Sequence, residues 1–483
     1  MKAFKKISVP FKYANNIEDL FVNDEELKTL IISSKNKRKN FYSGSLLHKW
    51  KDELLISHGW GKANRSFGDY FTINPVSKLP AWNVTKCSFN DLGINENVVS
   101  VFNNCGFWNA THIQVATIPT LMTGVNTILG GETGGGKTLA YTSPILNKLI
   151  NEKHINESSF HPKSIIMAPS WELCYQINKL ISPLASGLEL NCTLFKSHKN
   201  IKAGIDIIVS TPHCLNIALK SGDLNVKHLK IVVLDESDML LDQSFADVTT
   251  EVLSKLSIQT TKPIDGMPVG SQLILANATC PQSVAEYFGN FIPIESFRVL
   301  IMENMHKLIP NVSHKFIRSN KLQKSVLLLT TLKKKGLNKS PYTIIFCNCK
   351  NSVNDVSSLL SENGIEHSTL HKDIGIDERQ QNFDKFQNGL VRVLVCTDLG
   401  ARGLDTVKAS QVINYEFPMF IGDYLHRSGR VGRVGSSETG KVLNIISSRK
   451  EIKAVQIIEK SIRLGFKLPN IDTSRHANDN LNT

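Results

Sequence analysis

Short apolar runs separated by longer amphipathic stretches dominate the chain from about residue 87 onward. Each run is rich in Ile, Val or Leu and lacks the apolar–polar alternation of a strand with one solvent-facing side. Strands buried on both faces of a parallel sheet have this composition, and spacings of roughly 25 to 45 residues leave room for crossover helices. The runs of the first half are Thr127–Leu129, Ser164–Ala168, Asp206–Val209, Ile231–Leu234 and Gln272–Ala276.

A second series of apolar runs lies beyond a mixed segment around Pro310. The two series predict an α/β protein with two tandem domains, each a parallel sheet flanked by helices. The second series comprises Thr343–Phe346, Val391–Cys396, Val412–Ile413 and Val442–Ile446. The expected divisions are a basic N-terminal extension at 1–85, a first domain at 86–301, a linker at 302–319, a second domain at 320–468 and a polar tail at 469–483.

Composition and charge narrow the class of partner. Hydrophobic residues make up 41% and charged residues 20% of the 483 residues, which is typical of a folded protein. The formal net charge of +13 favours a polyanionic partner, most commonly nucleic acid. No stretch reaches the roughly 18 consecutive apolar residues that a membrane span needs. The nine cysteines are scattered without a CxxC pair, which fits a reducing compartment.

The N-terminal region is rich in lysine, and its first acid is Glu18. Such a start is compatible with a mitochondrial targeting segment and equally with a solvated basic tail. A second basic cluster could contact RNA or serve as a nuclear signal, so both compartments remain open. That cluster consists of Lys35, Lys37, Arg38 and Lys39.

A phosphate-binding loop is the strongest chemical signal in the sequence. It matches G-x4-G-K-[ST] and lies between an apolar run and a helix-compatible stretch. Its glycines allow backbone N–H groups to converge on phosphates at a helix N-terminus. We expect Lys137 to bind the β- and γ-phosphates and the Thr138 hydroxyl to ligate Mg²⁺. The loop consists of Gly131, Glu132, Thr133, Gly134, Gly135, Gly136, Lys137 and Thr138.

Two carboxylates, Asp235 and Glu236, directly follow the apolar run Ile231–Leu234. They would lie at the carboxyl end of a buried parallel strand, where such folds bind ligands. Taken alone, these acids fit a helix N-cap as well as catalysis. About a hundred residues after a complete phosphate loop, catalysis is favoured: Asp235 is expected to hold Mg²⁺ and Glu236 to polarise the attacking water.

From about Phe89 to Arg433, these motifs resemble the DEAD-box family of superfamily-two RNA helicases. The resemblance implies two RecA-like domains, an ATP-binding domain and a helicase C-terminal domain, with ATP between them. Before the phosphate loop, Phe107 and Gln114 lie in a segment similar to the family's Q motif. In that motif the aromatic residue stacks on adenine and the glutamine binds the adenine edge. The resemblance therefore assigns Phe107 and Gln114 to ATP recognition.

The second half carries two further motifs that resemble those of the family. Residues 397–405 are similar to motif V, and residues 426–433 are similar to motif VI. The resemblance assigns Arg430 and Arg433 to the γ-phosphate as arginine fingers and Asp405 to the ribose. Arginine suits this role because its planar guanidinium spreads charge over the phosphoryl oxygens. The expected coupling residues are Asp238, Asn277, Thr279 and His426, and the expected RNA contacts are Thr211, Pro212, Thr397 and Arg402.

Several positions on the RNA side depart from the family's pattern. Trp171 and Cys214 stand where the family has arginines, and Asn277 stands where it usually has serine. Ile376 replaces the usual glutamine before Arg379. Trp171 could stack on a base, pack in the core or contact a protein, and packing is favoured. The lost cations predict weaker RNA binding, for which the basic extension could compensate.

The expected function is that of an ATP-dependent RNA helicase that remodels short duplexes or RNA–protein complexes with ATP and Mg²⁺. Gly131-Glu132 and the segment 240–245 also resemble a mitochondrial family member that acts in assembly of the large mitoribosomal subunit. That likeness implies ribosomal RNA, ribosomal or assembly-factor proteins as partners, and the mitochondrial matrix, with the nucleus or nucleolus as the alternative. The competing hypotheses are an ATP-controlled RNA clamp or scaffold with little unwinding and a DNA translocase of the same superfamily.

Overall fold

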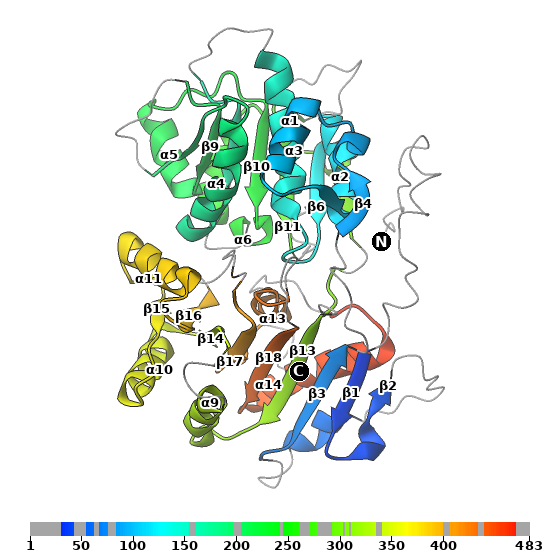
Figure 1. Cartoon of the computed structure of the whole chain (residues 1–483), viewed down its shortest axis with the longest axis vertical. Helices are drawn as coiled ribbons and strands as arrows, with labels where there is room; N and C mark the ends of the chain where they lie inside the picture. Colours follow the sequence, from blue (N-terminus) through cyan, green and yellow to red (C-terminus); the bar gives the residue numbers. More distant parts are fainter. Residues whose placement is uncertain are drawn as a thin grey trace.

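The chain folds into two α/β domains, each built around its own sheet (Figure 1). The expected architecture of two tandem parallel-sheet domains is therefore confirmed. The computed structural model describes residues 30–42, 55–61, 67–75, 84–153, 161–196, 204–241, 245–260, 270–278, 292–302, 305–308, 311–334, 341–398, 406, 408–432 and 439–469.

The first domain contains a seven-stranded sheet in which all neighbouring strands are parallel. Its strands are β6 (Asn126–Gly130), β7 (Ser164–Met167), β8 (Cys192–Leu194), β9 (Ile207–Ser210), β10 (Ile231–Asp235), β11 (Gln272–Asn277) and β12 (Phe297–Ile301). The order is β12-β6-β11-β10-β7-β9-β8, so the five predicted runs are the five inner strands. The two edge strands were not predicted: β8 has only three half-buried residues, and in β12 a charged residue, Arg298, interrupts the apolar residues.

Helices and one short strand pair complete this domain. The helices are α1 (Glu96–Asn104), α2 (His112–Met122), α3 (Lys137–Lys153), α4 (Trp171–Ser186), α5 (Pro212–Ser221), α6 (Ser237–Leu240) and α7 (Ala246–Ser254), and the strand pair is β4 (Val84–Ser88) with β5 (Asn109–Thr111). Strands β6 and β10 both pair with β11. The glycine-rich loop after β6 and the acids after β10 therefore emerge at the same edge of the sheet, where parallel sheets bind ligands.

The second domain has a nine-stranded sheet ordered β15-β16-β14-β17-β18-β13-β3-β1-β2. The six strands from β15 to β13 are mutually parallel: β13 (Val312–Arg318), β14 (Thr343–Cys347), β15 (Ser368–Leu370), β16 (Val393–Thr397), β17 (Gln411–Asn414) and β18 (Gly440–Ile446). Its helices are α9 (Gln323–Lys333), α10 (Lys350–Glu362), α11 (Ile376–Asn388), α13 (Ile421–Ser428) and α14 (Arg449–Leu464). All four predicted runs of the second series form inner strands.

Three N-terminal strands extend the second sheet rather than the first (Figure 1). They are β1 (Leu30–Ser34), β2 (Phe41–Tyr42) and β3 (Tyr70–Pro75), and β3 pairs antiparallel with β13. Phe71 lies opposite Phe316 in this register, and the two rings stack with centroids 4.7 Å apart. Ile32, Phe71 and Ile73 are fully buried in one cluster with α14 residues such as Val455. The described part of the N-terminal segment is thus built into the core of the second domain.

A short helical segment holds the N-terminal region onto α14. This 3-10 helix, Ile56–Gly61, places Trp60 in the second-domain core at 2% exposure. The fully buried Glu459 accepts hydrogen bonds from the backbone N–H groups of Ile56 and Ser57 at 2.8 and 3.1 Å. Arg463 pairs with Glu459 at 2.8 Å and donates to the Lys39 carbonyl. Because the buried carboxylate is paired and hydrogen-bonded, its desolvation is offset.

The structure differs from the expected divisions in two places. Residues 312–318 of the expected linker form β13, a central strand whose buried side chains alternate along it as in a strand with one core face. Strands β1 to β3 lie within the expected extension at 1–85 yet belong to the second sheet. The remaining boundaries stay predictions. Among the described residues, no helix is both long and apolar enough to cross a membrane.

Candidate active site between the two domains

The glycine-rich loop leads from β6 into α3 and encloses the Lys137 side chain. The Lys137 Nζ donates to the carbonyls of Gly131 and Glu132, both at 2.8 Å. Gly134 and Gly136 have positive φ angles of 81° and 96°, which a residue with a Cβ rarely adopts. Burial lowers the pKa of Lys137, while the surrounding carboxylates oppose that shift. The predicted strand–loop–helix context is present, with an ammonium in the mouth of the loop.

Gln114 links the start of α2 to this loop. Its Oε1 accepts from Thr111 N at 2.8 Å, and its Nε2 donates to Gly136 O at 3.1 Å. The side chain is 3% exposed, and one amide hydrogen remains for a further acceptor. Phe107 is half-buried against the first-domain core, while its neighbour Trp108 is 64% exposed. The adenine contacts of Gln114 and Phe107 stay predictions.

Asp235 and Glu236 stand at the carboxyl end of β10, facing the loop. Tyr141 on α3 donates its hydroxyl to Asp235 Oδ2 at 2.9 Å, a contact that the sequence did not suggest. Burial, reinforced by Glu236, raises the pKa of Asp235 to about 6, while Lys137 acts in the opposite direction. A cation that replaces the proton would stabilise the charged form. These oxygens therefore suit Mg²⁺, and Asp235 with Thr138 on α3 would hold it.

Glu236 adopts an unusual backbone conformation with one carboxylate oxygen left open. Its φ and ψ angles are 50° and 49°, in the left-handed region that non-glycine residues seldom occupy. The residue is 7% exposed, and its Oε2 has no hydrogen-bond partner in the described structure. A buried acceptor without a hydrogen-bond partner costs free energy, so its presence indicates a functional reason. This oxygen is available to orient a water molecule beside the loop.

Asn277 at the end of β11 connects the acidic turn with the glycine-rich loop. Its Oδ1 contacts the Ser237 hydroxyl, and its backbone carbonyl accepts from Gly131 N at 3.1 Å. Asn277 is fully buried, and its Nδ2 has no hydrogen-bond partner among the described residues. The predicted coupling position thus lies between the acidic turn and the glycine-rich loop, and its role stays a prediction.

Side chains at the C-terminal end of α13 and just beyond it reach Asp238 and Glu236 of the first domain. The His426 Nε2 lies 3.4 Å from Asp238 Oδ2, and both side chains are buried. The Arg430 Nη2 lies 3.8 Å from Glu236 Oε1, and Arg430 is 2% exposed. Between them, Gly429 approaches the loop so closely that a Cβ there would overlap the Thr133 hydroxyl. The structure therefore brings predicted residues of both domains together at one place.

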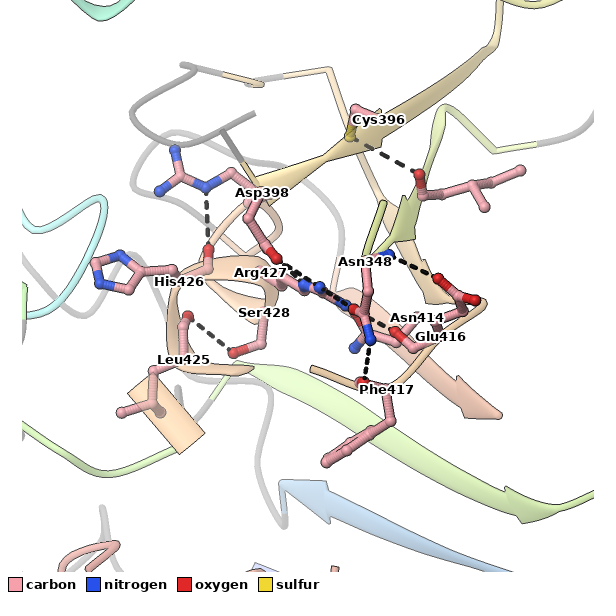
Figure 2. A network of polar contacts seen from close by, with 12 residues as sticks. Asn348, Cys396, Asp398, Asn414, Glu416, Phe417, Leu425, His426, Arg427 and Ser428 are labelled. Atoms are coloured by element: carbon pink, nitrogen blue, oxygen red, sulfur yellow. Dashed lines mark hydrogen bonds and ion pairs between the residues drawn. The ribbon is translucent and has the colours of Figure 1, made fainter. Parts of the chain in front are cut away.

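Arg427 in the same helix has a different, structural environment. Its guanidinium makes two hydrogen bonds of 2.6 Å with Asp398 and further bonds with Asn348 and the Glu416 carbonyl (Figure 2). It also lies over the Phe346 ring, 5.2 Å from the centroid, and is 1% exposed. With its donors used inside the second domain, Arg427 fixes α13 to the sheet rather than reaching the loop.

Two further ion pairs join the two domains. Arg379 Nε lies 2.9 Å from Glu172 Oε1, with side chains 14% and 2% exposed. Lys196 Nζ lies 2.8 Å from Asp377 in an exposed pair and 5.3 Å from the Trp171 ring centroid. Burial raises the pKa of Glu172, and Arg379 partly offsets this. Trp171 is half-buried beneath a lysine, rather than inside the core as favoured from the sequence.

For the remaining predicted site residues, the structure gives a position in one of the domains, or they lie outside the described residues. Thr211 and Pro212 begin α5 in the first domain, and Thr397 ends β16 in the second. Cys214 donates to the Lys196 carbonyl at 3.4 Å, and Ile376 is 42% exposed at the start of α11. Thr279, Arg402, Asp405 and Arg433 lie outside the described residues.

Comparison with known proteins assigns the family. Residues 111–287 match the DEAD/DEAH box helicase family, and residues 320–435 match the helicase conserved C-terminal domain. The probable ATP-dependent RNA helicase DDX28 of Mus musculus is 32% identical over 466 residues, covering 92% of this chain and 86% of the mouse protein. The chain is a DEAD-box ATP-dependent RNA helicase.

Two other proteins are similar to this helicase, one by its solved structure and one by its sequence. Dbp5 of S. cerevisiae bound to RNA and ADP BeF3 has a TM-score of 0.67 and 26% identity, covering 78% of this helicase and 93% of that chain. The mitochondrial DEAD-box ATP-dependent RNA helicase 9 of Arabidopsis thaliana is 29% identical over 395 residues, covering 80% of this helicase and 61% of that protein. The two RecA-like domains of this helicase agree with these likenesses.

Proposed function

We propose that this helicase is an RNA-stimulated ATPase that remodels short RNA duplexes or RNA–protein complexes during ribosome assembly in the mitochondrial matrix. The observation that carries the proposal is the 3.8 Å approach of Arg430 to Glu236 across the domain interface. One domain supplies the phosphate loop and the acids, and the other supplies the arginine. Hydrolysis then requires both domains to be closed, and a ligand that favours the closed state accelerates it.

The described residues suit ATP with Mg²⁺ in this arrangement. Lys137 and the loop amides would hold the phosphates, and Thr138 and Asp235 would hold Mg²⁺, which neutralises charge on the phosphate oxygens. Glu236 orients the attacking water through its open Oε2. Arg430 lies where its guanidinium stabilises negative charge that develops on the transferred group, and Arg433 is proposed as its companion.

RNA is the ligand proposed to favour closure. Thr211 and Pro212 on the first domain and Thr397 and Arg402 on the second are proposed to contact its backbone, so one strand would bridge both domains. Phosphate and 2′-hydroxyl contacts carry little sequence information, which fits a broad RNA substrate. Ribosomal RNA is the proposed physiological substrate, with ribosomal or assembly-factor proteins as partners.

The proposed location is supported by two observations. The N-terminal region begins with lysines at positions 2, 5, 6 and 12 before its first acid, a pattern compatible with a mitochondrial targeting segment. One relative carries the word mitochondrial in its name. Protease protection of a tagged full-length chain in isolated mitochondria tests the location, and enrichment in nuclei instead would contradict it.

The activity is tested with two parallel assays on the full chain. ATP hydrolysis is measured with RNA and with DNA of equal sequence, and strand displacement is measured on a short RNA duplex. We expect stimulation by RNA alone and displacement that depends on ATP. Equal stimulation by DNA would favour a translocase. RNA retention that depends on ATP without displacement would favour the clamp, which the substitutions at Trp171 and Cys214 make the second candidate.

A further inference from the structure

The N-terminal strands give the second sheet a face that differs from the rest of the molecule. Along β1, β3 and β13, alternate residues such as Ile32, Phe71 and Phe316 point into the core beneath α14. The residues between them, among them Ser33, Thr72 and Lys315, are half-buried on the opposite face. An antiparallel extension with one core face leaves its second face available to solvent or to a ligand.

Helix α9 covers only part of that second face. Its Leu328 and Leu332 pack against Ile345 of β14 and Ile445 of β18. Figure 1 shows β3, β1 and β2 extending away from α9 at the lower edge of the second domain. No described helix covers the strands beyond α9 on this side in Figure 1. We call this surface the extension face and define it by the outward residues of β1, β3 and β13, together with Lys35 after β1 and Lys334 at the end of α9.

Hydrogen-bonded polar side chains line the extension face. The hydroxyls of Ser33 and Thr72 are 2.6 Å apart, Asn74 Nδ2 donates to Thr72 at 3.3 Å, and Ser313 donates to Asn74 Oδ1 at 2.6 Å. None of the exposed large hydrophobic side chains in the described structure lies on β1, β3 or β13. Such a surface suits a polar ligand and does not suit insertion into a lipid bilayer.

Two lysines lie over the ring of Tyr70 at one end of this face. Lys315 Nζ lies 4.5 Å and Lys35 Nζ 5.7 Å from the centroid of the Tyr70 ring. Arg318 lies over Phe67 in the same way, at 5.1 Å. The aromatic rings hold these flexible cations in defined positions, which reduces the entropy lost when an anion binds them.

No carboxylate of the described residues forms an ion pair with Lys35, Lys315, Arg318 or Lys334. Burial lowers the pKa of Lys315, and the neighbouring charge of Lys334 at the end of α9 adds to the shift. The exposed Lys37 and Arg38 follow Lys35 directly. Lys35 donates to the Gly68 carbonyl, and Arg318 donates to the carbonyls of Ser319 and Ile446. Backbone oxygens therefore compensate these charges only in part. Like charges gathered without carboxylate ion pairs cost free energy in the isolated protein, and a polyanion would relieve that cost.

We propose that the extension face binds the phosphate backbone of RNA, and that it is a second RNA-binding surface separate from the interdomain cleft. The proposal rests on RNA being the substrate of this helicase. Lys35, Lys315 and Lys334 bind phosphates, and the hydroxyl and amide groups of Ser33, Thr72 and Asn74 contact sugar and phosphate oxygens. The surface compensates for the cations absent at Trp171 and Cys214, because it retains the RNA while the cleft opens and closes.

The test replaces three of the cations in the full chain: Lys35→Gln, Lys315→Gln and Lys334→Gln together. A matched control replaces the exposed Lys450, Lys453 and Lys467 of α14 and its C-terminal flank with Gln, so the net charge changes equally. Binding of a fluorescent single-stranded RNA is measured by anisotropy without nucleotide over a range of KCl concentrations. RNA-stimulated ATPase is measured alongside, together with the melting temperature.

We expect the triple variant to bind RNA about 10- to 100-fold more weakly at 0.1 M salt and to lose about 2–3 units of the salt slope. Its kcat at saturating RNA stays at the wild-type value, while the RNA concentration for half-stimulation rises. The control variant keeps the wild-type slope. Unchanged affinity and slope in the triple variant would overturn the proposal, as would an equal loss in the control.

Two further measurements keep the result decisive. If the triple variant melts at a lower temperature, the single exposed substitution Lys35→Glu replaces it, and wild-type affinity in that variant overturns the proposal. Vesicles of phosphatidylserine and phosphatidylcholine serve as a second polyanion. If the variant loses vesicle binding while its RNA affinity is intact, the face is not an RNA site. Absence of RNA stimulation in the wild type contradicts the proposed function instead, whatever the binding result.

Discussion

Gly429, directly after α13, contacts Thr133 of the glycine-rich loop with no room for a side chain between them. The two residues belong to different domains. Because glycine lacks a Cβ, the helix end can approach the loop and bring Arg430 to within 3.8 Å of Glu236. The approach of Arg430 to Glu236, on which the proposed reaction depends, therefore requires a residue without a side chain at position 429.

Gly429→Ala should lower kcat about 10²-fold, because a displacement of the helix of about 1 Å is enough to misplace Arg430. The affinity for ATP should stay close to that of the wild type, since the loop itself is unchanged. The measurement is steady-state ATPase at saturating RNA, together with nucleotide binding. Gly375→Ala is the control, because no atom lies within 4 Å of its added Cβ. Wild-type kcat in Gly429→Ala would show that the contact is not needed.

Glu236→Gln should abolish most ATP hydrolysis while ATP and RNA still bind. The amide keeps the shape of the carboxylate but is a poor base, so the loss should be about 10²–10⁴-fold in kcat. The complex with ATP and RNA should then dissociate slowly, which is measured by chasing labelled RNA. Glu362→Gln, at an exposed acid at the end of α10, makes the same chemical change away from the site and should leave hydrolysis unchanged. Rapid RNA release from the Glu236 variant would contradict the closure mechanism.

Substitutions of Arg430 and Arg427 should affect different properties: catalysis for Arg430 and stability for Arg427. Arg430→Ala should reduce kcat by about 10³-fold or more with little change in stability, because its partner Glu236 keeps access to solvent when the domains open. Arg427→Ala should lower the free energy of unfolding by about 3–5 kcal/mol, because it removes both hydrogen bonds that the buried guanidinium makes with Asp398. Urea unfolding and ATPase assays on both variants separate the effects. An Arg427 variant that is stable but inactive would assign it to the reaction instead.

The sequence was most informative where structure is determined locally. The inner strands of the first sheet, and β14, β16, β17 and β18 of the second, each contain an apolar run. The loop from Gly131 to Thr138 carries its chemistry within eight adjacent residues. The pairing of β3 with β13 could not be predicted in the same way. It joins Phe71 to Phe316 across about half of the chain, and both strands are short and half-polar. Nothing in either segment alone identifies its partner.

The different roles of Arg427 and Arg430 were also beyond the sequence alone. Both residues belong to the same motif, three positions apart, and the resemblance assigned Arg430 but left Arg427 without a role. Helix α13 ends at Ser428, so Arg427 points into the second domain while Arg430 follows the turn toward the loop. Tyr141 is a similar case: it reads as an ordinary core aromatic of α3, and only the fold brings its hydroxyl to Asp235.

The free energy of unfolding should decrease as the pH is lowered below about 6.5, because His314 is buried in its neutral form. This residue is fully buried in β13, with Nδ1 2.7 Å from the Tyr424 hydroxyl, and burial lowers its pKa to about 3. The folded chain therefore keeps His314 neutral, whereas the unfolded chain takes up a proton near its ordinary pKa. Falling pH then favours unfolding, and about 2 kcal/mol should be lost between pH 6.5 and pH 5.

The measurement compares urea unfolding of the wild type and of His314→Gln between pH 5 and pH 8. The variant should be less stable at pH 8, since its side chain fits the site less well, but its stability should depend less on pH by about one proton. His213→Gln, at an exposed histidine of α5, should leave the dependence unchanged. Parallel pH profiles for the wild type and the His314 variant would contradict the assignment.

Deleting residues 1–75 should destroy the second domain rather than merely remove a basic tail. The deletion takes away Ile32, Trp60, Phe71 and Ile73 from the core, and each buried side chain contributes about 1.5–3 kcal/mol. Their sum is comparable to the roughly 5–15 kcal/mol that stabilises a whole domain. It also leaves the N–H and C=O groups along one side of β13 unpaired, which promotes aggregation.

The matched deletion is that of residues 1–29, which ends before β1 and removes several lysines without touching the described core. This shorter deletion should keep the wild-type melting temperature and ATPase, whereas the longer one should be insoluble or should melt well below it. Thermal unfolding and size-exclusion chromatography of both proteins provide the comparison. A soluble, cooperatively melting protein lacking residues 1–75 would show that β3 contributes little to the second sheet. If the truncated protein were folded, a loss of RNA binding could be ascribed to its missing positive charge. If it were unfolded, the loss would say nothing about charge. For this reason RNA binding is tested with point variants on the extension face.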